Sequence, residues 1–287
     1  MNCTKNYGIK EFNGFKFKYY FQDTMGHNLF DLEDSFEWEP HIGKFAKLFY
    51  KYFNTKNIID IGANFGYHTV FFSPLCTENV FAFEPQLQNF NLLKDNVELN
   101  NIQNVVLSNY ACGDTNCEVK LPAYDDTVYV NMGDITPNIL DNAKLYTTTK
   151  SIRLDDQIFN SNIDLIKIDV QGWEIKVLEG AKNLIKTHKP ALIIEFEEKQ
   201  LNKTHTSCKE LFDFIRKLDY YIFFLDYCYP TDHLCIHKDN LEDFRNKFND
   251  YILPHGIDNE FNHNIKNGVT EKIFEFVLVK KNENEDS

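Results

Sequence analysis

Four carboxylates in this sequence stand at or next to the ends of short apolar runs. The runs and their acids are Ile58–Ile61 with Asp60, Val80–Phe83 with Glu84, Leu165–Ile168 with Asp169, and Ala191–Ile194 with Glu195. Predominantly apolar runs of this length are typical of strands that are buried on both faces. The carboxyl ends of parallel strands meet at one edge of a sheet, where ligands bind. The spacing therefore predicts a doubly wound α/β sheet with an acidic crevice.

The first run continues into a glycine-containing turn that follows the pattern D-x-G-x-x-x-G. Gly62 and Gly66 allow the backbone to turn sharply and to approach a ligand, and a helix should follow. The dinucleotide fingerprint G-x-G-x-x-G is not met, because Asn64 and Tyr67 stand where its later glycines would be. The pattern favours an amino-acid-like ligand whose amino end faces Asp60. An ordinary strand-turn-helix without a ligand is the alternative.

Glu84 lies 18 residues beyond Gly66, at the end of the next expected strand. A carboxylate in this position can accept hydrogen bonds from both ribose hydroxyls of a nucleoside. Beyond the third strand, Asn109 or Asp114 is placed to accept a hydrogen bond from an adenine amine. The alternative for Glu84 is a simple stabilising charge at a helix N-terminus.

Lys167 shares a strand face with Asp169 through the two-residue alternation of a strand. A buried lysine needs a partner, and Asp60, Asp169 and Glu195 are the candidates. Either a structural ion pair or a charge network at a site would satisfy this requirement.

The length of 287 residues and the apolar share of 43% fit one large domain. We expect an N-terminal cap region over 1–56, with a strand at Phe15–Tyr20, followed by a main domain over 57–287. Insertions are expected at 115–150 and 228–268, and a strand at 221–225 should form an antiparallel hairpin with a last strand at 273–279. His233 and His237 are then loop residues, and no metal site is expected, because no further ligands follow them.

Charge and cysteine usage bear on partners and compartment. The formal net charge of −13 argues against a nucleic-acid partner held through its phosphates. Seven scattered cysteines without a C-x-x-C pair indicate neither a zinc site nor a disulfide framework. No apolar stretch approaches the length of a membrane span. We therefore expect a cytoplasmic protein without membrane contact; its oligomeric state stays open.

Several ordered motifs together resemble the FkbM-type methyltransferases, which are S-adenosylmethionine-dependent O-methyltransferases. The matching stretches are 37–40 (EWEP), 60–68 (DIGANFGYH), 83–85 (FEP), 153–156 (RLDD) and 167–181 (KIDVQGWEIKVLEGA). Gln171 is a departure, since the family usually has a glutamate there. The resemblance implies a Rossmann-like class I fold, with a mostly parallel seven-stranded sheet that has an antiparallel C-terminal strand. It also implies S-adenosylmethionine as cofactor, bound at Asp60, Gly62, Asn64, Gly66, Glu84, Asn109 and Asp114.

We therefore expect an O-methyltransferase that acts on a hydroxyl of a sugar, a glycan or a glycosylated small molecule. Asp169 is the favoured residue for positioning the hydroxyl and accepting its proton, although burial would have to raise its pKa. His68 is the alternative base, and Glu195 is a supporting carboxylate. A nucleic-acid methylase is the first rival, but the stretch after Ile168 does not resemble its N-P-P-Y-like turn. An NAD-dependent oxidoreductase and a nucleoside-binding module without catalysis are the others.

Overall fold

The structure is a computed structural model that describes most of the chain. The described residues are 7–21, 23, 24, 26, 38–123, 131–139, 145–225 and 231–249, together with the backbone of 252–254 and 276–278. Among these residues, no helix is long and apolar enough to cross a membrane.

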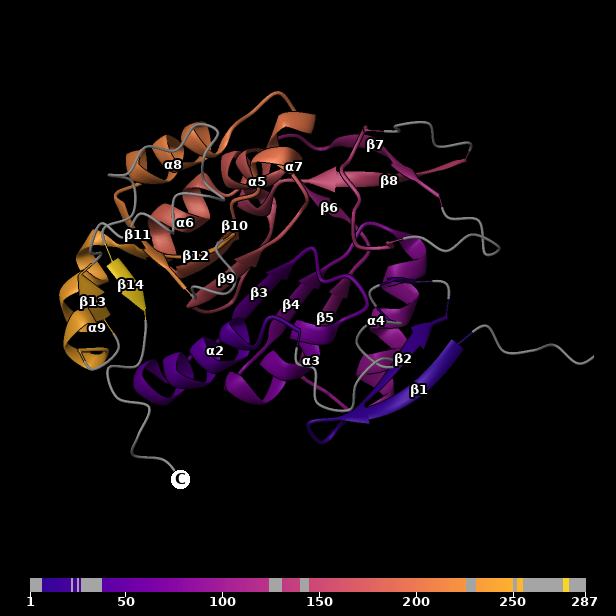
Figure 1. Ribbon diagram of the computed structural model, residues 1–287, viewed down its shortest axis with the longest axis horizontal. Coiled ribbons are helices and arrows are strands. Elements are labelled where there is room, and N and C mark those ends of the chain that lie inside the picture. The colour runs from indigo at the N-terminus through magenta and orange to yellow at the C-terminus, as the bar shows by residue number, and fades with distance from the viewer. Residues whose placement is uncertain are drawn as a thin grey trace, which may run out of the picture.

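A mixed sheet forms the centre of the molecule (Figure 1). Its strand order is β13-β14-β11-β12-β10-β9-β3-β4-β5. Five of these strands run parallel to one another: β5 (Val105–Ser108), β4 (Val80–Phe83), β3 (Ile58–Ile61), β9 (Leu165–Ile168) and β10 (Ala191–Glu195). The apolar runs of the sequence are confirmed as parallel strands, and their carboxyl ends meet at one edge.

The C-terminal part of the sheet differs from the prediction. The antiparallel strand of the seven-stranded core is β12 (Asp232–His237), which lies between β10 and β11 (Tyr220–Phe224). The predicted strands at 221–225 and 273–279 do pair, but their predicted antiparallel orientation was wrong, because β14 (Phe276–Leu278) runs parallel to β11. With β13 (Ile252–Pro254), β14 extends the sheet beyond β11. The remaining predicted residues of the last strand lie outside the described part of the chain.

The prediction of a loop at His233 and His237 was also wrong, because both belong to β12. The sequence of this strand, DHLCIH, mixes polar and apolar residues, yet all six side chains are buried between helices on either face. Burial lowers the pKa of His233 to about 3, so its ring is neutral in the fold. No group of three or more residues suited to a metal ion occurs among the described residues.

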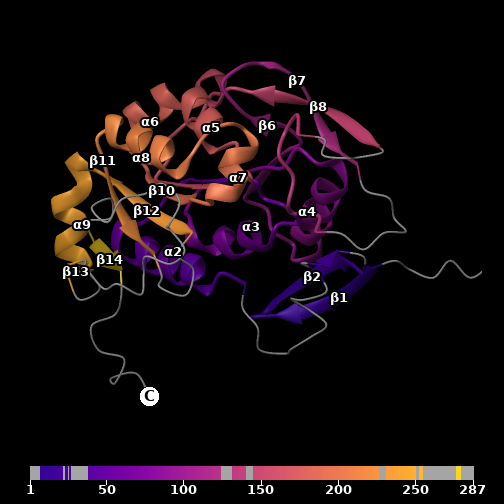
Figure 2. The ribbon, with the colours of Figure 1, turned by 45° about the horizontal axis from the view of Figure 1, so that its top comes forward.

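Helices cover both faces of the sheet (Figures 1 and 2). One face packs on α5 (Glu174–Gly180), α6 (Lys182–His188) and α8 (Cys208–Lys217). The other packs on α2 (Pro40–Phe53), α3 (Tyr67–Phe72), α4 (Leu87–Leu99) and α9 (Leu241–Lys247). Within β3, Ile58 belongs to the core beneath α2, whereas Ile59 and Ile61 belong to the core beneath α5 and α6. This alternation explains why the strands are apolar on both faces, apart from Asp60 in β3 and Lys167 in β9.

Two smaller units flank the central sheet. A hairpin of β1 (Tyr7–Phe12) and β2 (Phe15–Tyr20) lies on α4, where Asn96 and Asn100 accept backbone N–H groups of β2. A three-stranded sheet contains β6 (Ala111–Cys112), β8 (Tyr146–Ile152) and β7 (Cys117–Pro122). It occupies part of the predicted insertion at 115–150. The division of the chain at residue 57 stays a prediction, since α2 packs into the core of the sheet.

Shorter elements complete the described structure. They are the 3₁₀ turns η1 (Ser73–Leu75), η2 (Leu154–Asp156) and η3 (Lys238–Asn240), and the helix α7 (Glu198–Lys203).

Candidate active site

The turn between β3 and α3 brings two strand ends into close contact. Gly62 has a φ of 78°, and a Cβ atom at this position would lie 1.8 Å from the carbonyl oxygen of Asp169. Gly66 has a φ of 91° and precedes α3, where a Cβ atom would lie 2.6 Å from Leu93. Only glycine tolerates both the conformation and the contact at these positions. Gly62 therefore allows the ends of β3 and β9 to meet, and Gly66 allows the turn to pack against Leu93 of α4.

A cleft opens over this turn at the carboxyl ends of β3, β4, β9 and β10. Its walls come from four parts of the chain: the N-terminal segment, the turns after the strands, the 131–137 segment and the start of α4. The walls include polar side chains and the turn glycine Gly62. The polar residues include Glu39, Asn64, Glu84, Asn89, Asp169, Gln171 and Glu195. Trp38, Tyr110, Met132, Ile135 and Trp173 supply apolar surface.

Glu84 lines one side of the cleft and is held by backbone donors. The N–H of Asn64 donates to its Oε2 at 2.8 Å, and the N–H of Gln86 donates to its Oε1 at 2.9 Å. Burial raises the pKa of Glu84 to about 7, against the lowering effect of these two bonds. Each carboxylate oxygen keeps a second lone pair, so Glu84 can still accept two ligand hydroxyls.

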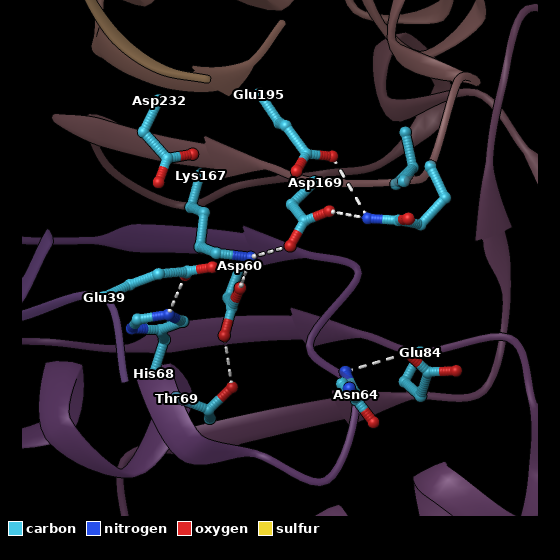
Figure 3. Close-up of polar contacts among 12 residues, drawn as sticks. Glu39, Asp60, Asn64, His68, Thr69, Glu84, Lys167, Asp169, Glu195 and Asp232 are labelled. Atoms are coloured by element: carbon cyan, nitrogen blue, oxygen red, sulfur yellow. Dashed lines mark hydrogen bonds and ion pairs between the residues drawn. The ribbon is translucent and has the colours of Figure 1, made fainter. Parts of the chain in front are cut away.

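A buried lysine lies beneath the cleft floor (Figure 3). The Nζ of Lys167 is 3.4 Å from Asp169 Oδ2 and 3.8 Å from Asp60 Oδ1. Burial lowers the pKa of Lys167, but Asp169 and Asp60 outweigh it and hold the pKa above its ordinary value. Thr69 donates a hydrogen bond of 2.5 Å to the other oxygen of Asp60. Two of the three partners proposed from the sequence are therefore confirmed as ion-pair partners of Lys167.

Asp169 and Glu195 share one donor on the cleft wall. The side-chain amide of Gln171 donates to Asp169 Oδ1 at 2.8 Å and to Glu195 Oε2 at 3.1 Å. Burial raises the pKa of Asp169, but Lys167 and Gln171 outweigh it, so the pKa lies below its ordinary value. Burial and the Asp169 charge raise the pKa of Glu195 well above its ordinary value. The pKa values of the two neighbouring carboxyl groups are therefore shifted in opposite directions.

Two carboxylate–histidine contacts lie next to this pair, and the sequence analysis did not predict either pairing. Glu39 Oε2 is 2.8 Å from His68 Nε2, and Asp232 Oδ2 is 2.7 Å from His41 Nε2. Glu39 precedes α2 with a φ of 44°, a left-handed conformation that is costly for a glutamate. The sequence signals for Glu39 were its place in the E-W-E-P stretch and beside the expected crevice, where Glu39 or His41 was a candidate to cap the ligand pocket. Glu39 lines the cleft, and Glu37 lies outside the described residues. Burial raises the pKa of Asp232 to about 6.

The predicted site residues fall into two groups. Gly62, Asn64, Glu84, Asp169 and Glu195 line the cleft. The other predicted residues, Asp60, Gly66, His68, Asn109 and Asp114, are not among the described residues that line it.

Physical reasons account for the second group. Asp60 is fully buried under the turn, and His68 lies behind Glu39. The amide nitrogen of Asn109 donates to the carbonyls of Glu84 and Pro85, and Asp114 pairs with Lys176 at 2.7 Å.

Comparison with known proteins places the chain in a family. Residues 60–222 match the model of the methyltransferase FkbM domain, which is more than half of the chain. The chain therefore belongs to the FkbM methyltransferase family and is an S-adenosylmethionine-dependent methyltransferase. A search of curated proteins found no match.

Solved structures show distant similarity. A methyltransferase FkbM from Methylobacillus flagellatus is 19% identical with a TM-score of 0.44, over 64% of this chain and 44% of that one. This chain thus spans less than half of that protein. M. jannaschii TYW2 in complex with AdoMet is 14% identical with a TM-score of 0.40, over 82% and 86%. An rRNA methylase from Streptococcus thermophilus is 13% identical with a TM-score of 0.42, over 71% and 99%.

The cleft suits the cofactor in the chemistry of its donors and acceptors. The glycine at position 62 leaves the backbone open where a Cβ atom would collide, and the buried Glu84 keeps lone pairs for hydroxyl groups. The carboxylates around it suit a ligand with positive charge. These features match an amino-acid nucleoside better than a dinucleotide pyrophosphate, which needs close approach to several backbone N–H groups.

Proposed function

We propose that this methyltransferase acts on a hydroxyl of a sugar, a glycan or a glycosylated small molecule. The observation that favours this proposal is the Asp169–Gln171–Glu195 group, which opens into the cofactor cleft beside the glycine turn. A hydroxyl is a weak nucleophile, and a carboxylate that accepts its hydrogen bond both orients the oxygen and increases its electron density.

In this proposal, residues at the carboxyl ends of β3 and β4 bind the cofactor. S-adenosylmethionine supplies a methyl group that its sulfonium already activates. Glu84 accepts hydrogen bonds from the ribose hydroxyls, while Gly62 and Asn64 form the turn that the cofactor contacts. Asp60 and Gly66 act from beneath, because they hold Lys167 and the start of α3 in place. Asn109 holds the turn after Glu84 through two carbonyl contacts.

We propose that Asp169 contacts the hydroxyl of the acceptor. The side chain of Asp169 retains 28% of its exposure, whereas Lys167 behind it retains 3%. The sequence analysis required burial to raise the pKa of Asp169, and this expectation was wrong, because Lys167 lowers the pKa instead. Asp169 is therefore better suited to orient the hydroxyl than to retain its proton. Glu195 is proposed to support Asp169 through Gln171.

His68 remains the alternative proton acceptor, acting through Glu39. Glu39 lines the cleft and contacts the imidazole at 2.8 Å, so a proton taken up at the Glu39 carboxylate can be passed to the ring. This route keeps a carboxylate next to the acceptor and a base behind it.

The charge of the cleft disfavours the nucleic-acid alternative. Among the described residues that line the cleft there is no lysine or arginine, whereas Glu39, Glu84, Asp169 and Glu195 are all acidic. A phosphate backbone requires cationic contacts, which also make its binding depend on salt. Duplex DNA and RNA should therefore bind weakly, and a submicromolar, salt-resistant complex in a gel-shift assay would favour the nucleic-acid enzyme.

A turnover screen with free sugars, nucleotide sugars and glycans tests the proposal. With an active acceptor, Asp169→Asn should lower kcat far more than it lowers cofactor affinity, because it keeps the shape and removes the charge. His68→Gln is the matched variant for the alternative base. If Asp169→Asn turns over normally and His68→Gln abolishes transfer, the roles are reversed. Binding of S-adenosylmethionine without turnover of any acceptor would favour a module that has lost catalysis. A cytoplasmic location stays a prediction.

A further inference from the structure

Asn89 lies in the first turn of α4, on the wall of the cofactor cleft. Its side chain is 2% exposed, and it follows Glu84 by five residues on the same connection. Its backbone N–H donates to Gln86 Oε1 at 3.1 Å, and its side-chain nitrogen donates to the carbonyl of Met132 at 2.8 Å. Its Oδ1 atom is buried and accepts no hydrogen bond from the described part of the chain.

The orientation of this amide is determined by its neighbour. A carbonyl oxygen can only accept, so the group that faces Met132 must be the amide nitrogen. Met132 is held in turn, because its N–H donates to Asp23 Oδ1 at 3.1 Å. The oxygen of Asn89 therefore cannot exchange places with the nitrogen without loss of this contact. A buried acceptor without a donor is costly, which indicates that a ligand supplies one.

The nucleoside half of S-adenosylmethionine offers three such donors: the exocyclic amine of adenine and the two ribose hydroxyls. Neither residue expected from the sequence to meet the amine lines the cleft, since the Asn109 amide is held at the carbonyls of Glu84 and Pro85 and Asp114 pairs with Lys176. We propose that Asn89 is a cofactor-binding residue whose Oδ1 accepts a hydrogen bond from the nucleoside. This inference rests on the cofactor site proposed above.

Calorimetry with S-adenosylhomocysteine and three analogues tests this contact without any acceptor. The analogues carry purine in place of adenine, a 2′-deoxyribose or a 3′-deoxyribose. In the wild-type protein, the analogue that lacks the partner donor should bind about tenfold more weakly than the parent, the effect of one hydrogen bond. Asn89→Leu should bind the parent ligand about tenfold more weakly than the wild-type protein does. The analogue should bind to Asn89→Leu as tightly as the parent does, because the contact is already lost.

The control variant is Asn91→Leu, an exposed asparagine on the same helix. It should bind all four ligands like the wild-type protein. Asn89→Asp keeps an acceptor oxygen but cannot donate to Met132, so it separates the two roles of the side chain. The penalty for the missing donor should persist in Asn89→Asp and vanish in Asn89→Leu. If Asn89→Leu does not fold, Asn89→Ala provides the same comparison.

The outcomes separate this inference from the proposed function. If the wild-type protein binds no S-adenosylhomocysteine, the cofactor site itself is wrong. The other case is that the wild-type protein binds S-adenosylhomocysteine, but each analogue binds more weakly than the parent by the same factor in Asn89→Leu as in the wild-type protein. Asn89 then makes no contact with the nucleoside, and the inference is overturned.

Discussion

Replacing Lys167 with methionine should reveal how strongly the charge network under the cleft depends on its buried cation. Lys167 is 3% exposed and Asp60 is fully buried, and their charged atoms are 3.8 Å apart. Asp169 adds a second carboxylate at 3.4 Å. Methionine matches the apolar length of lysine, so Lys167→Met removes the charge with little change of packing. Asp60 and Asp169 are then left without their compensating cation.

The magnitude follows from the burial of these groups. Removing one partner of a buried ion pair costs about 3–5 kcal/mol of unfolding free energy, because the other charge stays buried. The pair of Lys209 and Asp213 provides the matched control, since its side chains are 47% and 44% exposed. An exposed pair contributes about 0.2–1 kcal/mol, so Lys209→Met should have at most this effect. Urea unfolding followed by circular dichroism measures both values.

The pH dependence identifies the cause of the loss. The pKa of Asp169 is lowered, so its stabilisation is present above the unfolded value of about 3.9 and is lost as the pH falls through the folded value. The pKa of Lys167 is raised, so its stabilisation is present below about 10.4 and is lost as the pH rises through the folded value. The network therefore stabilises the fold between these limits.

Without the cation, the pKa of Asp169 loses the lowering effect of Lys167 and rises. The deficit of Lys167→Met should then be largest at pH 7–8 and shrink as the pH falls toward 4, because protonation relieves the buried charge. Adding Asp60→Asn should recover part of the loss at pH 8. A deficit below about 1 kcal/mol, or one that is equal at every pH, would refute the reasoning, since a buried charge imbalance must produce both effects.

Three further outcomes follow from the site. Burial raises the pKa of Glu174 to about 7, so the folded state holds its proton and stability falls as the pH rises from about 4.5 to 7; Glu174→Gln should flatten this fall, as measured by urea unfolding at pH 5 and 8. Gly62→Ala should lower the Tm and abolish cofactor binding, because its Cβ atom would collide with the Asp169 carbonyl, whereas Gly43→Ala, with open space around it, should keep both. Glu84→Ala should weaken S-adenosylmethionine binding by a few kcal/mol in calorimetry, and NAD should bind to neither protein; unchanged affinity would remove Glu84 from the site.

The parallel core of the fold was predictable because its signals are local. Each run is short, predominantly apolar and has a carboxylate at or next to its carboxyl end, so both burial and direction can be predicted from the sequence. The convergence of Asp60 and Asp169 on Lys167 also follows, since parallel strands place their ends together and alternation puts Lys167 and Asp169 on one face.

The residues that the prediction missed or misplaced depend on contacts between distant segments. Asn109 and Asp114 follow the right strand, but their side chains have nearer partners in Pro85 and Lys176. The role of Asn89 depends on Met132, which is 43 residues away in sequence. No local pattern specifies which of several asparagines has an unpaired oxygen.

The strand β12 shows why the acidic side of the cleft could not be predicted in full. Its mixture of polar and apolar residues resembles a loop or an edge strand, but pairing with both β10 and β11 buries it. This pairing sets Asp232 opposite Glu195, and Asp232 helps to raise the pKa of Glu195.

Gln171 gives a physical reason for the departure from the usual glutamate. Its amide donates to two carboxylates at once, which an ionised glutamate at the same position cannot do. A glutamate would add another negative charge beside Asp169 and Glu195, which the neutral amide avoids. In this chain, the amide instead joins the two carboxyl groups on one wall of the cleft. The departure therefore limits the negative charge of that wall.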